Sequence, residues 1–196
     1  MFRYYPSIRK KITFGYYAIV AIIIGLSIFS FMELRFVETK MMFGEIISEF
    51  FDATLEIRRF EKNYFLYEKE YDYLENIRYV TKAQELIEGN IEGFNAIVTY
   101  AQITALKNNL KSYRELMEQY SSALASLRKH SDAQRTILEE KIRKSGKDII
   151  TVAENISNTE RKKLQTTLSK YRYTLIFSII FLSILSIAIG QVLSRM

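Results

Sequence analysis

One short stretch, residues 58–67, gathers the side chains whose types and spacing favour chemistry. It combines Arg and Lys side chains with two tyrosines. Guanidinium and ammonium groups bind carboxylates and phosphates through charge-assisted hydrogen bonds. The stretch therefore predicts a site for a small anion such as a carboxylate, held by the cations and covered by the tyrosines as polar lids. The residues of this predicted ligand site are Arg58, Arg59, Lys62, Tyr64 and Tyr67.

Glu61 supports a second interpretation of the same stretch. It falls on the apolar stripe of a predicted helix, where an unpaired charge is costly. Arg58 lies three residues earlier, at the spacing of an ion pair on one helix face. The alternative is therefore a structural salt bridge between Arg58 and Glu61, or between Glu61 and a neighbouring helix. An exposed patch without a role is the third possibility.

Three more polar side chains, Gln84, Tyr113 and Tyr120, fall at core spacing in predicted helices. Tyrosines at such positions pack in the core with the hydroxyl at its rim, and lining a pocket is their alternative role. The single histidine, His130, stands in a predicted turn, and the chain has no Cys, so we expect no metal site.

Catalytic motifs are absent from the sequence. It contains no Gly-rich phosphate loop, no nucleophile elbow and no HExxH. The neighbouring carboxylates Glu139 and Glu140 have helix-surface spacing and no His to work with. We therefore expect no enzyme activity and no cofactor in this chain.

Two uncharged apolar runs stand near the ends of the chain, from Ile12 to Met32 and from Tyr173 to Ser194. At about 1.5 Å per residue, a helix over either run reaches roughly 30 Å, the thickness of a bilayer's hydrocarbon core. Each run therefore predicts a transmembrane helix. The first is longer than the apolar part of a secretory signal peptide, and no small-residue cleavage site follows, so we expect it to remain as an anchor.

The formal net charge of +6 does not indicate nucleic-acid binding once its location is considered. All 22 acidic residues lie between the two runs, together with most of the 28 Lys and Arg residues, so this segment is nearly neutral. The surplus basic residues flank the runs. We expect a membrane protein with no nucleic-acid partner.

The basic residues before the first run place the N-terminus in the cytoplasm by the positive-inside rule. A basic cluster at 161–172 argues the other way, but the charges of long segments count little in that rule. The expected organisation is a cytoplasmic N-terminus at 1–11, a span at 12–32 and an extracytoplasmic domain at 33–172. A second span at 173–194 and the start of a cytoplasmic region at 195–196 complete it. The absence of Cys fits an exported domain without disulfides.

The segment between the runs predicts four amphipathic helices with apolar residues at alternating three- and four-residue steps. The first extends the first run to about residue 66 and carries Phe36, Phe43, Ile47, Phe50, Thr54, Ile57, Glu61 and Tyr64. The second, at 72–98, carries Tyr73, Ile77, Val80, Gln84, Ile87, Ile91, Phe94 and Val98. The third carries Ile103, Leu106, Leu110, Tyr113, Met117, Tyr120, Leu124 and Leu127. The fourth runs into the second span through Leu138, Ile142, Ile149, Ile156, Leu164, Leu168 and Tyr171.

Local signals mark the ends and weak points of these helices. Capping-box patterns at 72–75, 99–102 and 131–134 predict three helix starts. Gly and Asn residues at 89–95 predict fraying late in the second helix. In the fourth helix, Gly146 and the polar run 157–163 interrupt the pattern. We expect that run to be solvated, with a loosely packed layer as the alternative.

Four such helices with short connections predict antiparallel neighbours. The expected fold is all-α, an up-down-up-down four-helix bundle whose first and last helices continue into the two transmembrane helices. The stripe of Phe43, Ile47 and Phe50 also suits dimerisation. If that stripe is buried in the bundle, Phe51 and Leu55 offer a second face.

The order of basic start, span, helical domain and span resembles the extracytoplasmic sensor region of bacterial transmembrane receptors. These are sensor histidine kinases and methyl-accepting chemotaxis receptors with four-helix-bundle or helical bimodular domains. Residues 58–67, RRFEKNYFLY, look like the Arg-x-x-Glu-Lys-x-(aromatic)-Leu-Leu pattern near the first-helix turn of the bimodular group. Residues 146–153, GKDIITVA, are similar to a Gly-containing segment in that group's last helix. Bimodular domains stack two bundles, whereas 33–172 has room for one.

The resemblance implies a signal-input module, above all that of a two-component sensor histidine kinase, in the inner membrane. It implies a homodimer and either a small anionic ligand or a periplasmic partner protein. In such receptors a HAMP linker and a kinase or signalling domain follow the second span, so we expect a fragment of a longer receptor. The alternatives are a chemoreceptor input domain and a membrane-anchored helical adaptor with no signalling output.

Overall fold

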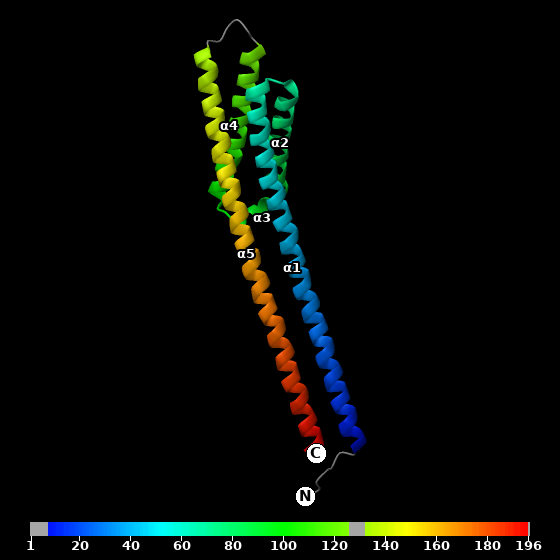
Figure 1. Ribbon diagram of the computed structural model, residues 1–196. Coiled ribbons are helices and arrows are strands. Elements are labelled where there is room, and N and C mark those ends of the chain that lie inside the picture. Colours follow the sequence, from blue (N-terminus) through cyan, green and yellow to red (C-terminus); the bar gives the residue numbers. More distant parts are fainter. Residues whose placement is uncertain (1–7, 126–131, 196) are drawn as a thin grey trace. The chain divides into compact units, whose positions relative to one another are not determined.

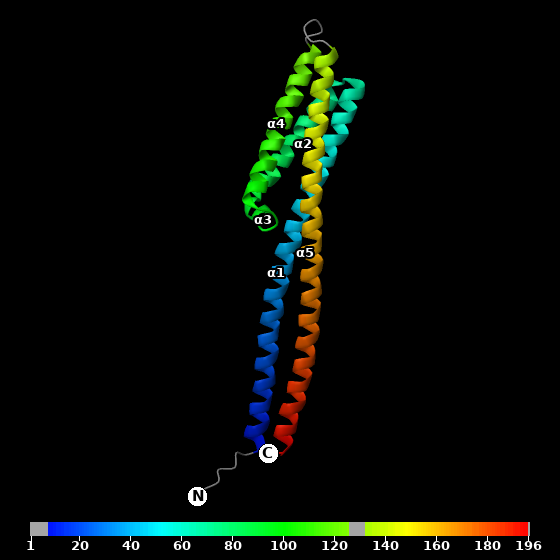
Figure 2. The same cartoon turned by 90° about the vertical axis from the view of Figure 1, so that its left-hand side faces the viewer.

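The computed structural model describes residues 8–125 and 132–195, and within them every regular element is a helix. The all-helical prediction is therefore confirmed over the described residues. The elements are α1 (Ile8–Tyr67), α2 (Glu70–Gly89), α3 (Ile91–Asn95), α4 (Tyr100–Ala125) and α5 (Asp132–Arg195). Figures 1 and 2 show α1, of 60 residues, and α5, of 64 residues, each as one uninterrupted helix.

The chain divides into two compact units, which we describe separately. The first, called the apolar unit below, comprises residues 1–41 and 164–196. The second, called the core unit, comprises Met42–Lys163. Each of the two long helices, α1 and α5, has one part in the apolar unit and one part in the core unit.

The apolar unit contains the two helical stretches that are long and apolar enough to cross a membrane. Their most apolar windows have a mean hydropathy of 2.2 and 2.3, and almost none of these residues is buried against protein. Ser27 and Ser178 donate their hydroxyls to carbonyl oxygens of their own helix, at 2.9 and 2.8 Å. Such bonds satisfy a hydroxyl without water, as a lipid surrounding requires. These features are compatible with a two-pass membrane protein.

The core unit buries the apolar stripes of α1 and α4 where the sequence predicts them. The buried stripe residues of α1 are Ile47, Phe50, Thr54, Ile57, Glu61 and Tyr64. Those of α4 are Ile103, Leu106, Leu110, Tyr113, Met117 and Tyr120. Both stripes follow three- and four-residue steps because these steps keep side chains on one face of a helix with 3.6 residues per turn.

Aromatic rings join the elements of this core. The Phe94 ring of α3 meets the rings of Phe43 and Phe50 of α1 edge to face, at centroid distances of 6.1 and 5.4 Å. Gly93 makes the first contact possible, since a Cβ there would lie 2.0 Å from the Phe43 ring. At the other end of the unit, the Tyr120 ring of α4 lies 5.8 Å from that of Tyr64.

The predicted second helix differs from the observed one in extent and in its buried face. It ends at Gly89 and, after Asn90, continues as the short α3, so the weak point predicted at 89–95 is a break. Val80 and Ile87 are buried as expected. However, Asn76 and Ala83 are buried where Ile77 and Gln84 were expected. Because Val80 and Ile87 lie on both faces, the buried face is rotated by roughly 50°, about half of the angle between consecutive residues.

The three predicted helix starts have different outcomes. The predicted helix start at the capping box 72–75 is wrong, because α2 begins at Glu70. Its N-cap is Lys69, which makes no side-chain capping bond. The box at 99–102 is confirmed. There the Thr99 N–H donates to the Gln102 side-chain oxygen at 2.9 Å, and the Gln102 N–H donates to the Thr99 hydroxyl at 3.4 Å. In the box at 131–134, the capping residue Ser131 lies outside the described residues.

Two further expectations about the core unit need correction. The polar run 157–163 is not solvated throughout, because Ser157 and Glu160 are only 6% and 5% exposed. The stripe proposed for dimerisation is not free either, because Ile47 and Phe50 are buried inside the unit. Leu55, the alternative, is 41% exposed.

Candidate functional site

The structure does not gather the predicted ligand-site residues around one space. Lys62 and Tyr67 are exposed, whereas Tyr64 is buried against the rings of two other tyrosines. Arg59 points outward, donates to Glu56 at 2.8 Å and lies over the Phe60 ring. Consecutive residues of a helix point about 100° apart, which is why these side chains diverge.

Glu61 is the residue of this stretch that the core unit surrounds. Its side chain is fully buried, and its carboxylate Oε1 accepts a hydrogen bond and ion pair from the Arg58 guanidinium, one turn earlier on α1. Arg58 is itself mostly buried, with 17% of its side chain exposed. This is the i,i+3 pair that the spacing predicts.

Gly146 of α5 provides the space for this pair. A Cβ at Gly146 would lie 2.6 Å from the Glu61 Oε2 atom and 2.7 Å from a terminal nitrogen of Arg58. The α5 backbone therefore packs directly on the ion pair. The sequence showed Gly146 only as an interruption of the apolar pattern, whereas its neighbours explain why a side chain is missing there.

Tyr113 of α4 and Asn76 of α2 complete a buried polar network around the carboxylate. The Tyr113 hydroxyl donates to the Glu61 Oε2 atom at 3.1 Å. The Asn76 amide nitrogen donates to the Tyr113 hydroxyl oxygen at 2.9 Å and to the Ile57 carbonyl oxygen at 2.8 Å. The Oδ1 atom of Asn76 is buried without a hydrogen-bond partner. Four helices thus meet at one carboxylate, which we call the Glu61 network.

Burial controls the protonation of the Glu61 network. Desolvation raises the pKa of Glu61 above its ordinary value of 4.5, against the opposing effects of Arg58, Tyr113 and Arg143. Desolvation and the Glu61 charge likewise raise the pKa of Tyr113 well above 10.0. Tyr113 therefore remains a neutral donor, while Glu61 takes up a proton more readily than an exposed carboxylate does.

Sequence reasoning missed Asn76 as a member of this network. The apolar stripe favoured its neighbour Ile77, since an amide at a core position is unusual. The only available signal was the polar pair Asp72 and Asn76. These residues are four apart and continue the helical spacing of the buried residues Val80 and Ala83. That spacing alone does not distinguish a buried polar face from a solvated one.

The other polar candidates are satisfied by local partners. The Oε1 atom of Gln84 accepts from Arg114 of α4 at 3.1 Å. The Tyr120 hydroxyl donates to a carboxylate oxygen of Glu139 on α5 at 2.9 Å. Burial first, and the Glu139 carboxylate next, raise the pKa of Tyr120 to about 12, although Arg135 opposes them.

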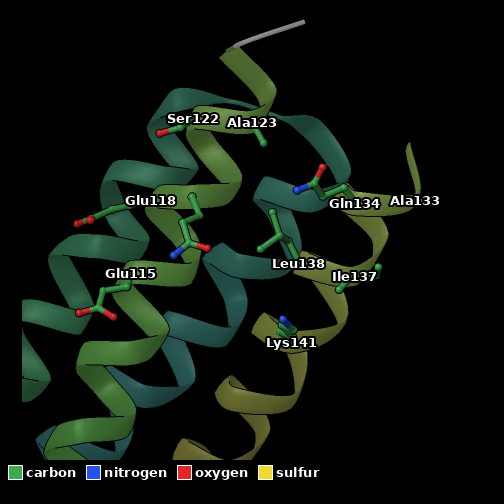
Figure 3. Close-up of a pocket in the computed structure, with 10 residues that line it drawn as sticks. Glu115, Glu118, Ser122, Ala123, Ala133, Gln134, Ile137, Leu138 and Lys141 are labelled. Atoms are coloured by element: carbon green, nitrogen blue, oxygen red, sulfur yellow. The ribbon is translucent and has the colours of Figure 1, made fainter. Parts of the chain in front are cut away.

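A surface groove of about 1180 Å³ lies between α4 and α5. Figure 3 shows Leu138 between the two helices, whereas the carboxylates of Glu115 and Glu118 point away from it. The charged groups therefore do not converge on a common point, and none of the predicted ligand-site residues lines the groove. It lacks the few convergent polar groups that orient a small ligand.

His130 lies outside the described residues. Among the described ones, no group of His, Cys, Asp or Glu side chains is arranged to hold a metal ion. Comparisons with protein-family models, curated proteins and solved structures find no match to this chain. The Glu61 network is consequently the best-defined candidate site, on its geometry and electrostatics.

Proposed function

We propose that the chain is the signal-input module of a bacterial transmembrane receptor, of the sensor histidine kinase class. The core unit would be an extracytoplasmic four-helix-bundle sensor domain formed by α1, α2, α4 and α5. One observation carries this proposal: α1 and α5 each continue without a break from a membrane-length apolar stretch into the core unit. A rigid helix can transmit a displacement along its whole length.

The relay works through two alternative packings of α1 and α5. A stimulus shifts their populations only if it interacts more strongly with one packing than with the other. The buried contacts of these helices offer such a difference, because cores repack between discrete arrangements rather than deform continuously. The module itself needs no catalytic residues or cofactor, since a kinase output acts on the far side of the membrane.

The proposed location is the bacterial inner membrane, with both termini in the cytoplasm and the core unit outside. The basic residues at the N-terminal end favour this orientation. A homodimer is also proposed, with the exposed face around Leu55 as the available contact, since Ile47 is buried. The anion site predicted at residues 58–67 is not part of this proposal, because Arg58 pairs with Glu61 and Arg59 with Glu56.

Cysteine labelling tests the proposed topology cleanly, since the chain has no native Cys. Ser112→Cys places a thiol on the exposed face of α4, and Lys10→Cys places one at the basic start of α1. In intact cells, a membrane-impermeant maleimide should label the first variant and reach the second only after permeabilisation. The reverse pattern would place the core unit in the cytoplasm and end the sensor proposal.

A fusion tests whether the module relays a signal. A histidine-kinase output module is joined after Met196, and autophosphorylation is measured in membrane vesicles. Ile57→Ala loosens the core on α1 and should shift the kinase activity severalfold, whereas the exposed Ser112→Ala should not. Equal activity in all three fusions would favour a membrane-anchored adaptor that transmits nothing.

A further inference from the structure

The Glu61 carboxylate faces donors from every helix packed around it. Arg58 of α1 and Tyr113 of α4 donate to its two oxygens. Arg143 of α5 contributes a favourable charge from further away. The contribution of α2 is the amide of Asn76, which reaches the carboxylate through Tyr113. The groups that the structure places around Glu61 are thus two cations, one hydroxyl and one amide.

The hydrogen bonds around Glu61 suit the ionised carboxylate and leave the hydrogen of the protonated one without an acceptor, whereas desolvation favours the protonated form. A protonated carboxyl carries a hydrogen that needs an acceptor, but the Arg58 guanidinium has only donors. If Tyr113 accepted that hydrogen, its own hydroxyl hydrogen would lose Glu61 as its acceptor. The other neighbour of the Tyr113 hydroxyl is the Asn76 amide nitrogen, which is itself a donor.

Arg58 is the member of the network that can leave. Its side chain is the partly exposed one of the pair, at 17% against 0% for Glu61. Its Cδ atom and a terminal nitrogen lie against Gly146, within 2.9 Å and 2.7 Å of where a Cβ would be. Departure of Arg58 therefore opens the contact between α1 and α5 at Gly146.

We propose that Glu61 is a proton-binding switch, and that its protonation releases Arg58 and changes the packing of α5 on α1. The stimulus is then acidification of the medium around the core unit. As a stimulus for a receptor, this inference rests on the function proposed above. Because desolvation raises the pKa of Glu61 above its ordinary value of 4.5, the switch takes up its proton at a higher pH than an exposed carboxylate does.

Spin-label distances in the full chain test the switch. Labels attached to Glu45→Cys on α1 and Lys147→Cys on α5 occupy exposed positions of the core unit, away from Leu55. Between about pH 8 and about pH 4, a range that begins below the ordinary Glu value of 4.5, the mean distance should shift with a single midpoint above that value. We expect a shift of roughly 1–2 Å, the size of helix movements in switching proteins.

Three variants in this labelled background identify the proton site. Glu61→Gln is neutral at every pH and should show the acid distance throughout. Glu56→Gln is the matched control, because Glu56 pairs with Arg59 at the same spacing on the same helix but near the surface; it should respond like the wild type. Tyr113→Phe removes a donor to the ionised carboxylate and should move the midpoint to higher pH.

Three results would overturn the switch: a distance independent of pH, an unchanged pH response in Glu61→Gln, or an unmoved midpoint in Tyr113→Phe. The distances need no output module, so they are separate from the receptor test. If the distance depends on pH but Ile57→Ala leaves the autophosphorylation of the fusion unchanged, the proton site is retained and the receptor function is excluded.

Discussion

The buried Glu61 is costly for the fold, and its partners determine whether that cost is met. A carboxylate without water loses several kcal/mol of hydration, and only well-placed donors and an opposite charge offset it. Arg58 and Tyr113 supply both. Because these partners come from two helices and Gly146 of a third lies against the pair, the network is satisfied in one helix register.

We predict that Glu61→Ala lowers the free energy of unfolding by about 3 kcal/mol, since it strands the Arg58 charge in a mostly buried position. The melting temperature of the full chain in detergent should fall by on the order of 10 °C. Glu56→Ala removes a surface partner of Arg59 and should change stability by about 0.5 kcal/mol or less. Equal melting temperatures for the two variants would contradict burial of Glu61.

The pH dependence of stability follows from the direction of the Glu61 pKa. Because the folded-state pKa lies above 4.5, the folded chain binds this proton more tightly than the unfolded chain does. The stabilisation of the folded chain by this tighter proton binding is fully present below pH 4.5, and it is lost as the pH rises through the folded-state pKa of Glu61. The melting temperature of the wild type minus that of Glu61→Gln should therefore fall across this window. A difference that rises with pH would reverse the sign of the shift.

Among the individual residues, the sequence predicted the Arg58–Glu61 ion pair but not the network around it. The positions of Arg58 and Glu61 on one helix are fixed by local geometry, so their spacing was sufficient. Asn76 and Tyr113 reach Glu61 only through packing of α2 and α4 on α1, which no local pattern describes. The predicted anion site stays a prediction. Arg59 pairs with Glu56 and Lys62 is exposed, because side chains of neighbouring residues on a helix point in different directions.

Among the helices, α5 needs a glycine at position 146 to pack closely on α1. Gly in a helix interior costs about 1 kcal/mol relative to Ala, so its presence at 146 requires a compensating contact. That contact is the approach of the α5 backbone to the Glu61 network. Gly93 in α3 serves the Phe43 ring in the same way.

We predict that Gly146→Ala destabilises the core unit by about 1–3 kcal/mol, despite the better helix propensity of Ala, because its Cβ overlaps Glu61 and Arg58. Gly89→Ala is the matched control, since no atom lies within 4 Å of its Cβ position. Its stability should be unchanged or up to about 1 kcal/mol higher. Denaturant unfolding of both variants measures this difference, and destabilisation of equal size at both positions would refute the close approach.

Helix starts and stops were predictable only where the signal acts locally. The Thr99 and Gln102 box formed as predicted, because its two bonds lie within four residues. The box at 72–75 failed because α2 begins earlier, which leaves Asp72 inside the first turn and buried. Tertiary burial of the rotated face of α2 therefore outweighed the local capping preference.

For the whole molecule, the sequence predicted the two apolar stretches and the helical segment between them, because both are properties of composition and period. The rotation of α2 and the inward use of Ile47 depend on how helices pack, and were missed or left open. The backbones of α1 and α5 run through both units. The proposed relay would therefore pass along these helices.

Breaking α1 between the two units tests whether this helix carries the proposed relay. Met41 is 58% exposed in the interior of α1, at the boundary of the apolar unit. Met41→Pro removes a backbone hydrogen bond and kinks the helix at a local cost of about 3 kcal/mol. In the kinase fusion, it should abolish the effect of Ile57→Ala on autophosphorylation, whereas Met41→Ala should preserve that effect. An effect of Ile57→Ala that survives the proline would mean that α5 alone carries the signal.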